Sequence, residues 1–241
     1  MQDDAYLNSL PVKSGFRLRG IEMSRLETFA DAAFAFALTL LVISFDKIPS
    51  SYDELINALK SVPAFAASFA IVVMLWVGHR TWSKRYGLDD ATSTILTMLL
   101  VFIIMVYVYP LRAMMAAFLS AFTGGWVPTE LQFESYSQVR GMFLVYGVGW
   151  LSVNGTLALL NGHALRIADD LHLNPLERFD TRTEAQAWTL VGLFGVFSIA
   201  IALAVPEHLL GLAGHVYFGL SVVMPLHARL RGRRRRLIRA P

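Results

Sequence analysis

Long apolar segments, separated by shorter polar ones, make up most of this 241-residue chain. A helix that crosses a membrane needs about 20 consecutive residues that are mostly apolar. Six segments of this kind cover residues 26–46, 62–82, 92–121, 139–161, 185–205 and 209–228. The pattern therefore predicts an all-α membrane protein with six transmembrane helices, the last two joined by a tight hairpin near Pro206.

Composition agrees with a membrane protein and excludes several kinds of site. The chain is 55% hydrophobic and 16% charged, whereas soluble domains carry about 25% charged residues. It contains no cysteine, which excludes disulfides, thiol catalysis and cysteine-based zinc sites. No metal site is predicted, because His208 and His215 have only Glu207 nearby as a further ligand.

The lysines and arginines predict on which side of the membrane the chain begins and ends. Seventeen of the 21 basic residues lie in the N-terminal segment, in the loops after the second and fourth apolar segments, and in the tail. Cytoplasmic loops carry an excess of Lys and Arg, so both termini are predicted to be cytoplasmic. The chain then divides into a cytoplasmic segment (1–24), a six-helix transmembrane domain (25–230) and a basic cytoplasmic tail (231–241).

The first apolar segment contains a carboxylate, Asp31. An ionised carboxylate inside a membrane needs a partner or a water-filled space. Arg25 lies about 240° away around the helix and does not share its face. We therefore expect the partner on another helix, where His79 and Arg80 are at a matching depth. The alternative is that Asp31 lies near the interface and reaches cytosolic water.

A stripe of larger side chains follows Asp31 on the same segment. Phe36, Leu40 and Ile43 are spaced i, i+4 and i+7, so they share one face of a helix. Thr39 lies on the same stripe and adds a hydroxyl group. The face is therefore apolar with one polar position.

The opening of this segment resembles a known family. Arg25, Phe29 and Asp31 fit the signature R-x-x-x-F-S-D of the transmembrane protein 175 family of potassium channels, and the segment from Thr39 to Val42 also resembles that family's first helix. Two later motifs follow in the same order. The second apolar segment has Trp76 and His79, which resemble the family's W-x-x-H.

The third motif is an acidic residue, Asp89 or Asp90, before a long apolar run that ends at Pro110. The resemblance covers roughly residues 25–112, and the second half of the chain matches only in its hydropathy.

The resemblance implies a fold and a function. Bacterial members of the family carry one six-helix unit, lie in the cell membrane and assemble as homotetramers around a pore lined by the first helix. They lack the carbonyl filter of ordinary potassium channels, and this sequence likewise has no T-V-G-Y-G. Carried over by position, Phe36, Leu40 and Ile43 form the apolar constriction, and Thr39 is the polar contact for the permeant potassium ion. The resemblance implies no catalysis and no cofactor.

Three departures from the family pattern leave other functions open. Ala30 replaces the serine of the signature, Ala32 replaces a glycine, and Phe36 stands where an aliphatic residue is usual. Four phenylalanines around one axis would narrow or dewet a pore. A non-conducting membrane scaffold and an ion- or proton-coupled transporter therefore remain alternatives. An enzyme is not expected, because the chain has no H-E-x-x-H, no G-x-S-x-G and no nucleotide loop.

Polar residues at the cytoplasmic ends of the first helices form a second candidate group. His79, together with Arg25 and Asp89 or Asp90, is predicted to form a cluster that holds the first three helices together. Because histidine titrates near neutrality, His79 is also a candidate for pH-sensitive gating.

The tail carries the densest run of charge in the sequence, with Arg233, Arg234, Arg235 and Arg236 in succession. One interpretation is an anchor that fixes topology. Another is binding to anionic lipid, at about 1 kcal/mol for each basic residue near the membrane surface. Nucleic-acid binding is not favoured, because the run is short, follows a membrane segment and lacks interleaved aromatic residues.

Overall fold

The computed structural model describes residues 2–43, 49–129 and 131–239. Apart from a two-stranded hairpin, its elements are helices. The N-terminal part comprises α1 (Gln2–Ser9), β1 (Val12–Lys13), β2 (Phe16–Arg17), α2 (Arg25–Ile43), α3 (Tyr52–Lys60) and α4 (Val62–Tyr86). The remainder comprises α5 (Ala91–Phe122), α6 (Tyr136–Arg166), α7 (Pro175–Ala204), η1 (Glu207–Leu209), α8 (Leu212–His215), η2 (Val216–Gly219) and α9 (Leu220–Arg239).

Among the described residues, five helical segments are long and apolar enough to cross a membrane. They are Tyr52–Tyr86, Ala91–Phe122, Tyr136–Arg166, Pro175–Ala204 and Glu207–Ile238. These five correspond to the second to sixth predicted segments. The first predicted segment begins as the 19-residue helix α2, but its last residues, 44–46, lie outside the described part of the chain.

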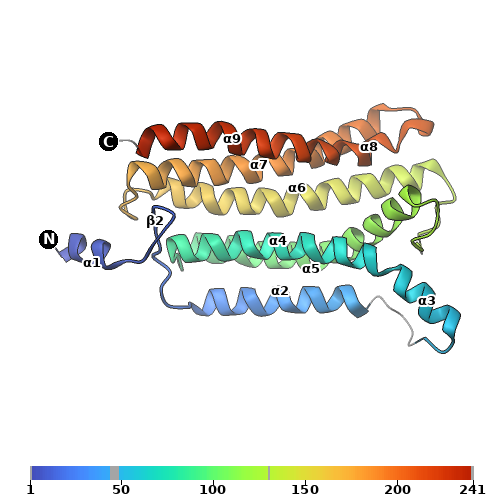
Figure 1. Cartoon of the computed structure of the whole chain (residues 1–241), viewed down its shortest axis with the longest axis horizontal. Coiled ribbons are helices and arrows are strands. Elements are labelled where there is room, and N and C mark those ends of the chain that lie inside the picture. Colours follow the sequence, from blue (N-terminus) through green and yellow to red (C-terminus); the bar gives the residue numbers. More distant parts are fainter. Residues whose placement is uncertain (1, 44–48, 130, 240–241) are drawn as a thin grey trace.

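The long helices lie side by side along one axis, and the two ends of the chain lie at the same end of this bundle (Figure 1). Helix α2 is at the edge, where it packs against α4 and α5. Helices α6 and α7 pack most closely. A methyl group on Gly195 would lie 2.5 Å from the carbonyl oxygen of Gly147, so these backbones meet where both residues lack a side chain. The glycines thus allow close packing, and α6 is continuous through them.

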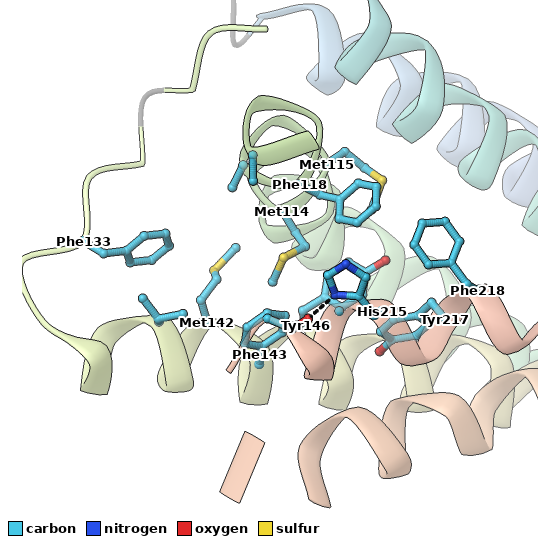
Figure 2. Close-up of a pocket in the computed structure, with 15 residues that line it drawn as sticks. Met114, Met115, Phe118, Phe133, Met142, Phe143, Tyr146, His215, Tyr217 and Phe218 are labelled. Atoms are coloured by element: carbon cyan, nitrogen blue, oxygen red, sulfur yellow. Dashed lines mark hydrogen bonds between the residues drawn. The ribbon is translucent and has the colours of Figure 1, made fainter. Parts of the chain in front are cut away.

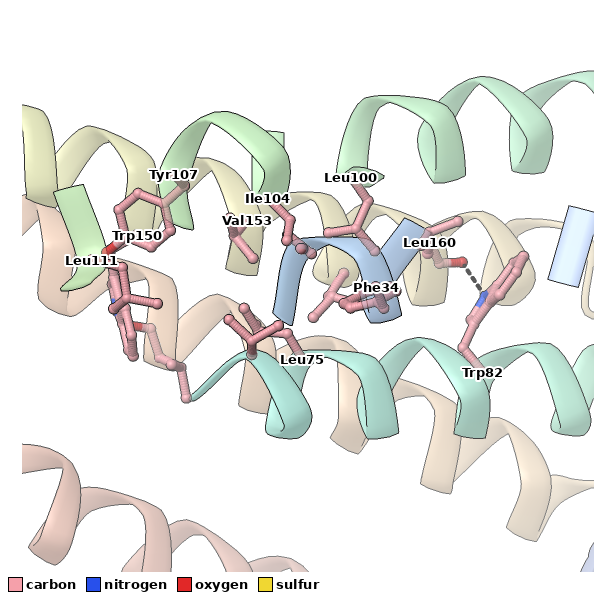
Figure 3. Close-up of a cluster of buried hydrophobic side chains, with 14 of the residues drawn as sticks. Phe34, Leu75, Trp82, Leu100, Ile104, Tyr107, Leu111, Trp150, Val153 and Leu160 are labelled. Atoms are coloured by element: carbon pink, nitrogen blue, oxygen red, sulfur yellow. Dashed lines mark hydrogen bonds between the residues drawn. The ribbon is translucent and has the colours of Figure 1, made fainter. Parts of the chain in front are cut away.

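The core of the bundle joins the N-terminal helices to α6. Figure 3 shows Phe34 of α2, Leu75 and Trp82 of α4, and Leu100 of α5 facing Leu160 of α6. The indole Nε1 of Trp82 donates a hydrogen bond of 2.9 Å to the carbonyl oxygen of Leu160. This bond satisfies a polar atom that burial would otherwise leave unpaired.

The sixth predicted segment, 209–228, differs from the structure at both ends. The chain turns back through η1, α8 and η2 before α9 begins at Leu220. Helix α9 then continues to Arg239, so the basic run is part of the same helix. The predicted boundary at residue 231 therefore does not mark a change of structure.

The N-terminal segment is folded onto the ends of α4 and α7. The backbone N–H of Gly20 donates to the carbonyl oxygen of Lys84 at 3.1 Å. The carboxylate of Glu177, which is fully buried, accepts the N–H of Arg17 at 2.8 Å, the N–H of Asn174 at 3.1 Å and Nη2 of Arg19 at 3.0 Å. We call this arrangement around Glu177 the N-terminal clasp.

Candidate functional site

Helix α2 has one buried face and one open face. Ala30, Ala33, Phe34, Ala37 and Leu41 are buried and turn toward α4 and α5. The exposed positions recur at helical spacing on the other side: Arg25, Thr28, Phe29, Ala32, Ala35, Phe36, Thr39 and Val42. In a single chain this second face, here called the open face, is not covered by the described helices.

The structure places the predicted stripe partly on this open face. The side chain of Phe36 is 53% exposed. Thr39 is exposed too, and its Oγ1 donates to the carbonyl oxygen of Ala35 at 3.1 Å. Leu40 is half-buried and packs against the core. The side chain of Ile43 lies outside the described residues.

Asp31 has a partner on a neighbouring helix. The indole Nε1 of Trp76, on α4, donates to Oδ1 of Asp31 at 2.7 Å. The guanidinium of Arg80, one turn further along α4, lies 5.2 Å from the centre of the same indole ring. The indole of Trp76 therefore contacts the carboxylate of Asp31 from α2 and the guanidinium of Arg80 from its own helix α4. The indole was already part of the matched motif, although its contact with Asp31 was not predicted.

His79 does not join Arg25, Asp89 or Asp90 in one cluster. It is 1% exposed, and its Nε2 shares a hydrogen bond of 3.2 Å with Oγ1 of Thr97 on α5. Arg25 and Asp89 are exposed. The predicted cluster is therefore corrected to a buried contact between α4 and α5, because His79 points into the bundle rather than toward its end.

Asp90 ties α5 to α6. Its carboxylate accepts the N–H groups of Thr92 and Ser93 at 2.8 and 3.1 Å and so caps the first turn of α5. Nε2 of His163, in the last turn of α6, donates to it at 3.0 Å. Burial alone would raise the pKa of Asp90, but the hydrogen bonds from His163 and Ser93 outweigh it and lower the pKa to about 2. His163 was not predicted, although a histidine in the last turn before a polar loop was a usable signal.

Arg112 contacts the other end of α2. Its Nη1 donates a hydrogen bond to the carbonyl oxygen of Leu41. The last carbonyls of a helix lack partners within the helix and carry partial negative charge. Arg112 therefore caps α2 from α5. A lone arginine inside a long apolar segment was the sequence signal for this role.

The basic tail is not uniformly turned toward lipid. Nε and Nη2 of Arg235 both lie 2.7 Å from the carboxylate of Asp180 on α7, and Nη2 also donates to the carbonyl oxygen of Ser14 at 2.6 Å. Arg233, Arg234 and Arg236 are exposed. The prediction for Arg235 is therefore corrected: α9 packs on α7, and Arg235 lies on the face of α9 that meets α7.

A cavity of about 450 Å³ lies between the second half of α5, the start of α6, and α8 with η2 (Figure 2). Its walls are apolar, with Met114, Phe118, Met142 and Phe143 facing one another (Figure 2). Such walls suit a hydrocarbon and offer a bare cation little in place of its water. The cavity is separate from the open face of α2. No group of three or more His, Asp or Glu side chains able to hold a metal occurs among the described residues.

Comparison with known proteins decides the family. Residues 25–110, from the start of α2 to Pro110 of α5, match the family model described as "Endosomal/lysosomal potassium channel TMEM175". A protein of Marivirga tractuosa named "Potassium channel" is 33% identical over 230 residues, which cover 92% of each chain. This chain belongs to the TMEM175 family of potassium channels. It is thus a multi-pass membrane protein of a channel family, which is not a class of enzyme.

Solved structures of the TMEM175 family share its fold. A crystal structure of a variant of the potassium channel MtTMEM175, in complex with a nanobody–MBP fusion protein, has a TM-score of 0.79 at 30% identity and covers 93% of this chain and 100% of that one. A homologue, from Chamaesiphon minutus, of the lysosomal potassium-selective channel TMEM175 has a TM-score of 0.57 at 21% identity and covers 85% of this chain and 96% of that one. The family model spans the whole contact between Asp31 and Trp76.

Proposed function

We propose that this protein is a potassium-permeable channel in which four copies surround a pore lined by α2. The open face of α2 carries the proposal. Phe36 and Thr39 lie on it without cover from the described helices of their own chain, and α2 stands at the edge of the bundle (Figure 1). A ring of copies would turn four such faces toward one axis.

In this proposal each subunit has six membrane-spanning helices, and both of its termini lie in the cytoplasm. Helix α2 would be the first span. The position of both chain ends at one end of the bundle supports this orientation. So does the distribution of Lys and Arg over the same end.

Apolar side chains would form the constriction in place of a carbonyl filter. Apolar constrictions in channels gate by dewetting, and Phe36, Leu40 and Ile43 are the proposed rings. Thr39 would be the polar contact. Its hydroxyl donates a hydrogen bond to the carbonyl oxygen of Ala35, so the lone pairs of the hydroxyl oxygen remain available to a potassium ion.

One observation favours a second candidate function, a non-conducting scaffold. The ring of Phe36 is large and 53% exposed on the face that would line the pore. Four such rings would occlude a narrow axis more completely than aliphatic side chains. Conduction by the wild type separates the two functions.

The test is potassium flux from loaded liposomes that contain the wild type, Phe36→Ala or Leu40→Ala. Phe102→Ala is the matched control, because Phe102 is 66% exposed on α5 and off the stripe. We expect wild-type flux, a several-fold rise for the two α2 variants as the constriction widens, and no change for the control.

Absence of flux from the wild type together with strong flux from Phe36→Ala would identify a channel closed by this ring. No flux from any folded variant would favour the scaffold. Equal changes in flux for Phe36→Ala and Phe102→Ala would show that the constriction does not lie on α2.

A further inference from the structure

The second half of α9 carries Arg231, an arginine with few hydrogen-bond acceptors, near two other arginines. The guanidinium of Arg231 stacks 4.2 Å from the centre of the Phe179 ring, and its Nε donates to Oγ1 of Thr183 at 2.9 Å. Neither terminal nitrogen donates a hydrogen bond to any described residue, and Nη2 is buried. A guanidinium has five N–H donors, so most of the donors of Arg231 have no acceptor in the described part of the chain.

The neighbouring charges are positive. Arg234, one turn further along α9, and Arg182, on α7, both lie within electrostatic range of Arg231. Both are exposed. We call Arg182, Arg231 and Arg234 the arginine triad. Three like charges gathered on two packed helices repel one another unless an anion lies between them.

The nearest acids are already paired. Asp180 accepts two hydrogen bonds from Arg235. Glu184 accepts Nη1 of Arg85 at 3.1 Å. The other group that faces Arg231 is His227, whose Nε2 is buried without a hydrogen-bond partner among the described residues. An anion that pairs with the triad would therefore come from outside this part of the chain.

The depth of the triad indicates the source of that anion. Arg182 comes three residues before the predicted span 185–205, and Arg231 comes three residues after the predicted span 209–228. One helical turn is about 3.6 residues, so Arg182 and Arg231 lie about one turn outside the predicted apolar spans, and Arg234 lies one turn further along α9. Headgroup phosphates lie at this level, and anionic lipids enrich the cytoplasmic leaflet.

We propose that the arginine triad binds the phosphate of an anionic phospholipid of the cytoplasmic leaflet. Arg231 donates to a phosphate oxygen through Nη1, since Nη2 is enclosed by the protein. Arg182 and Arg234 add charge from either side. The inference rests on the proposed orientation, with this end of the bundle in the cytoplasm, and it does not depend on conduction.

The test is binding of lipid to the full-length protein in detergent, measured by native mass spectrometry and by the rise in unfolding temperature. The probes are short-chain phosphatidylglycerol, short-chain phosphatidylcholine and inorganic phosphate. Two double variants are compared. The first combines Arg182→Gln and Arg234→Gln, and the second combines Arg233→Gln and Arg236→Gln. Both pairs are exposed and remove equal charge, but the second pair lies on another face of α9.

We expect phosphatidylglycerol to bind the wild type and to bind the first double variant roughly tenfold or more weakly, at about 1 kcal/mol for each lost arginine. The second double variant should stay near the wild type. Arg231→Lys, which keeps the charge but loses the planar guanidinium held by Phe179 and Thr183, should also weaken binding.

Equal losses in the two double variants would overturn the site in favour of diffuse attraction. Binding of phosphatidylcholine as tightly as phosphatidylglycerol would overturn the requirement for a net negative lipid. Inorganic phosphate as effective as the lipid would overturn the lipid as the source of the anion. None of these measurements uses ion flux. The proposed lipid site can therefore be contradicted without contradicting the proposed channel, and the reverse also holds.

Discussion

The contact between Asp31 and Trp76 is a direct hydrogen bond between side chains of α2 and α4. The indole donates to the carboxylate at 2.7 Å, and the same ring lies under the guanidinium of Arg80. A hydrogen bond to a charged group contributes about 1.5–3 kcal/mol. This contact therefore favours the rotation of α2 that brings Asp31 to the indole of Trp76 on α4.

Replacing Trp76 with phenylalanine keeps an aromatic ring and removes the N–H donor. We expect the Trp76→Phe variant to lose about 1.5–3 kcal/mol of unfolding free energy. Reversible detergent-induced unfolding measures the loss. Trp126→Phe is the control, since Trp126 is 55% exposed in a loop. If the effect of Trp76→Phe is the same in an Asp31→Ala background, which has no acceptor, the bond is not its cause.

The sequence predicted this contact only in part. A carboxylate in an apolar segment requires a partner, so a bond to another helix followed from Asp31 alone. The choice of Trp76 rather than His79 depends on the rotation of α4. That rotation is set by the packing of side chains such as Leu75 and Trp82 against other helices, and helical periodicity within one segment does not reveal it.

At the scale of elements, the ends of the helices are fixed by polar side chains from their neighbours. Asp90 caps α5 and accepts a hydrogen bond from His163 at the end of α6. Arg112 of α5 caps α2. The bond from His163 joins the end of α6 to the capped start of α5, and Arg112 satisfies a carbonyl near the end of α2, so helix ends are aligned as well as helix faces.

The cap at Asp90 makes a prediction about acid stability. Its folded-state pKa, about 2, lies below the ordinary value of 3.8. The ionised carboxylate therefore stabilises the fold above pH 3.8, and this contribution is lost as the pH falls toward 2. Asp90→Asn keeps a capping side chain but has no charge to lose. We expect the wild type to exceed this variant in unfolding free energy at pH 7 and to converge with it near pH 2.

The measurement is detergent-induced unfolding of both proteins across this pH range. Asp90→Ala, which removes the cap as well, should be about 1 kcal/mol less stable at pH 7 than Asp90→Asn. A difference between wild type and Asp90→Asn that does not change with pH would contradict the assigned shift.

Hydropathy was sufficient to locate the long helices and insufficient for their ends. The second to sixth predicted segments correspond to the five candidate spans. The broken start of the sixth, through η1, α8 and η2, was not predicted, because Gly211, Gly214 and Gly219 lie in a segment that is apolar throughout. Helix α3 was missed because it is short and amphipathic and contains no buried residue.

At the scale of the whole molecule, the N-terminal clasp connects distant parts of the chain. Glu177 at the start of α7 binds two segments of backbone and the guanidinium of Arg19. Removing one partner of a buried ion pair costs about 3–5 kcal/mol, because the other charge stays buried. The clasp should therefore be a major part of stability at this end of the bundle.

The Glu177→Gln variant tests this role. We expect a loss of about 3–5 kcal/mol of unfolding free energy, with faster trypsin cleavage after Lys13, Arg17 or Arg19 in the folded protein. Gel analysis of timed digests measures the cleavage. Glu207→Gln is the control, since Glu207 is exposed. Unchanged cleavage at these three sites would show that Glu177 does not hold the segment.

The sequence defined the family resemblance over residues 25–112, and the family model matches residues 25–110. The clasp was beyond prediction, because it pairs residues 158 positions apart, and no local pattern specifies such a pairing. The subunit arrangement rests on surfaces that one chain leaves open, so it remains a proposal.

The hydrogen bond between Gly20 and Lys84 has a mechanical consequence. The N-terminal segment is bonded at one point to the end of α4 and at another to Glu177 of α7. It therefore works as a strut between the pair of helices that supports α2 and the pair built from α6 and α7. Any hinge movement between these two halves must therefore break or distort hydrogen bonds of this segment. A peripheral segment of about 20 residues thus resists relative movement of the two halves of the bundle.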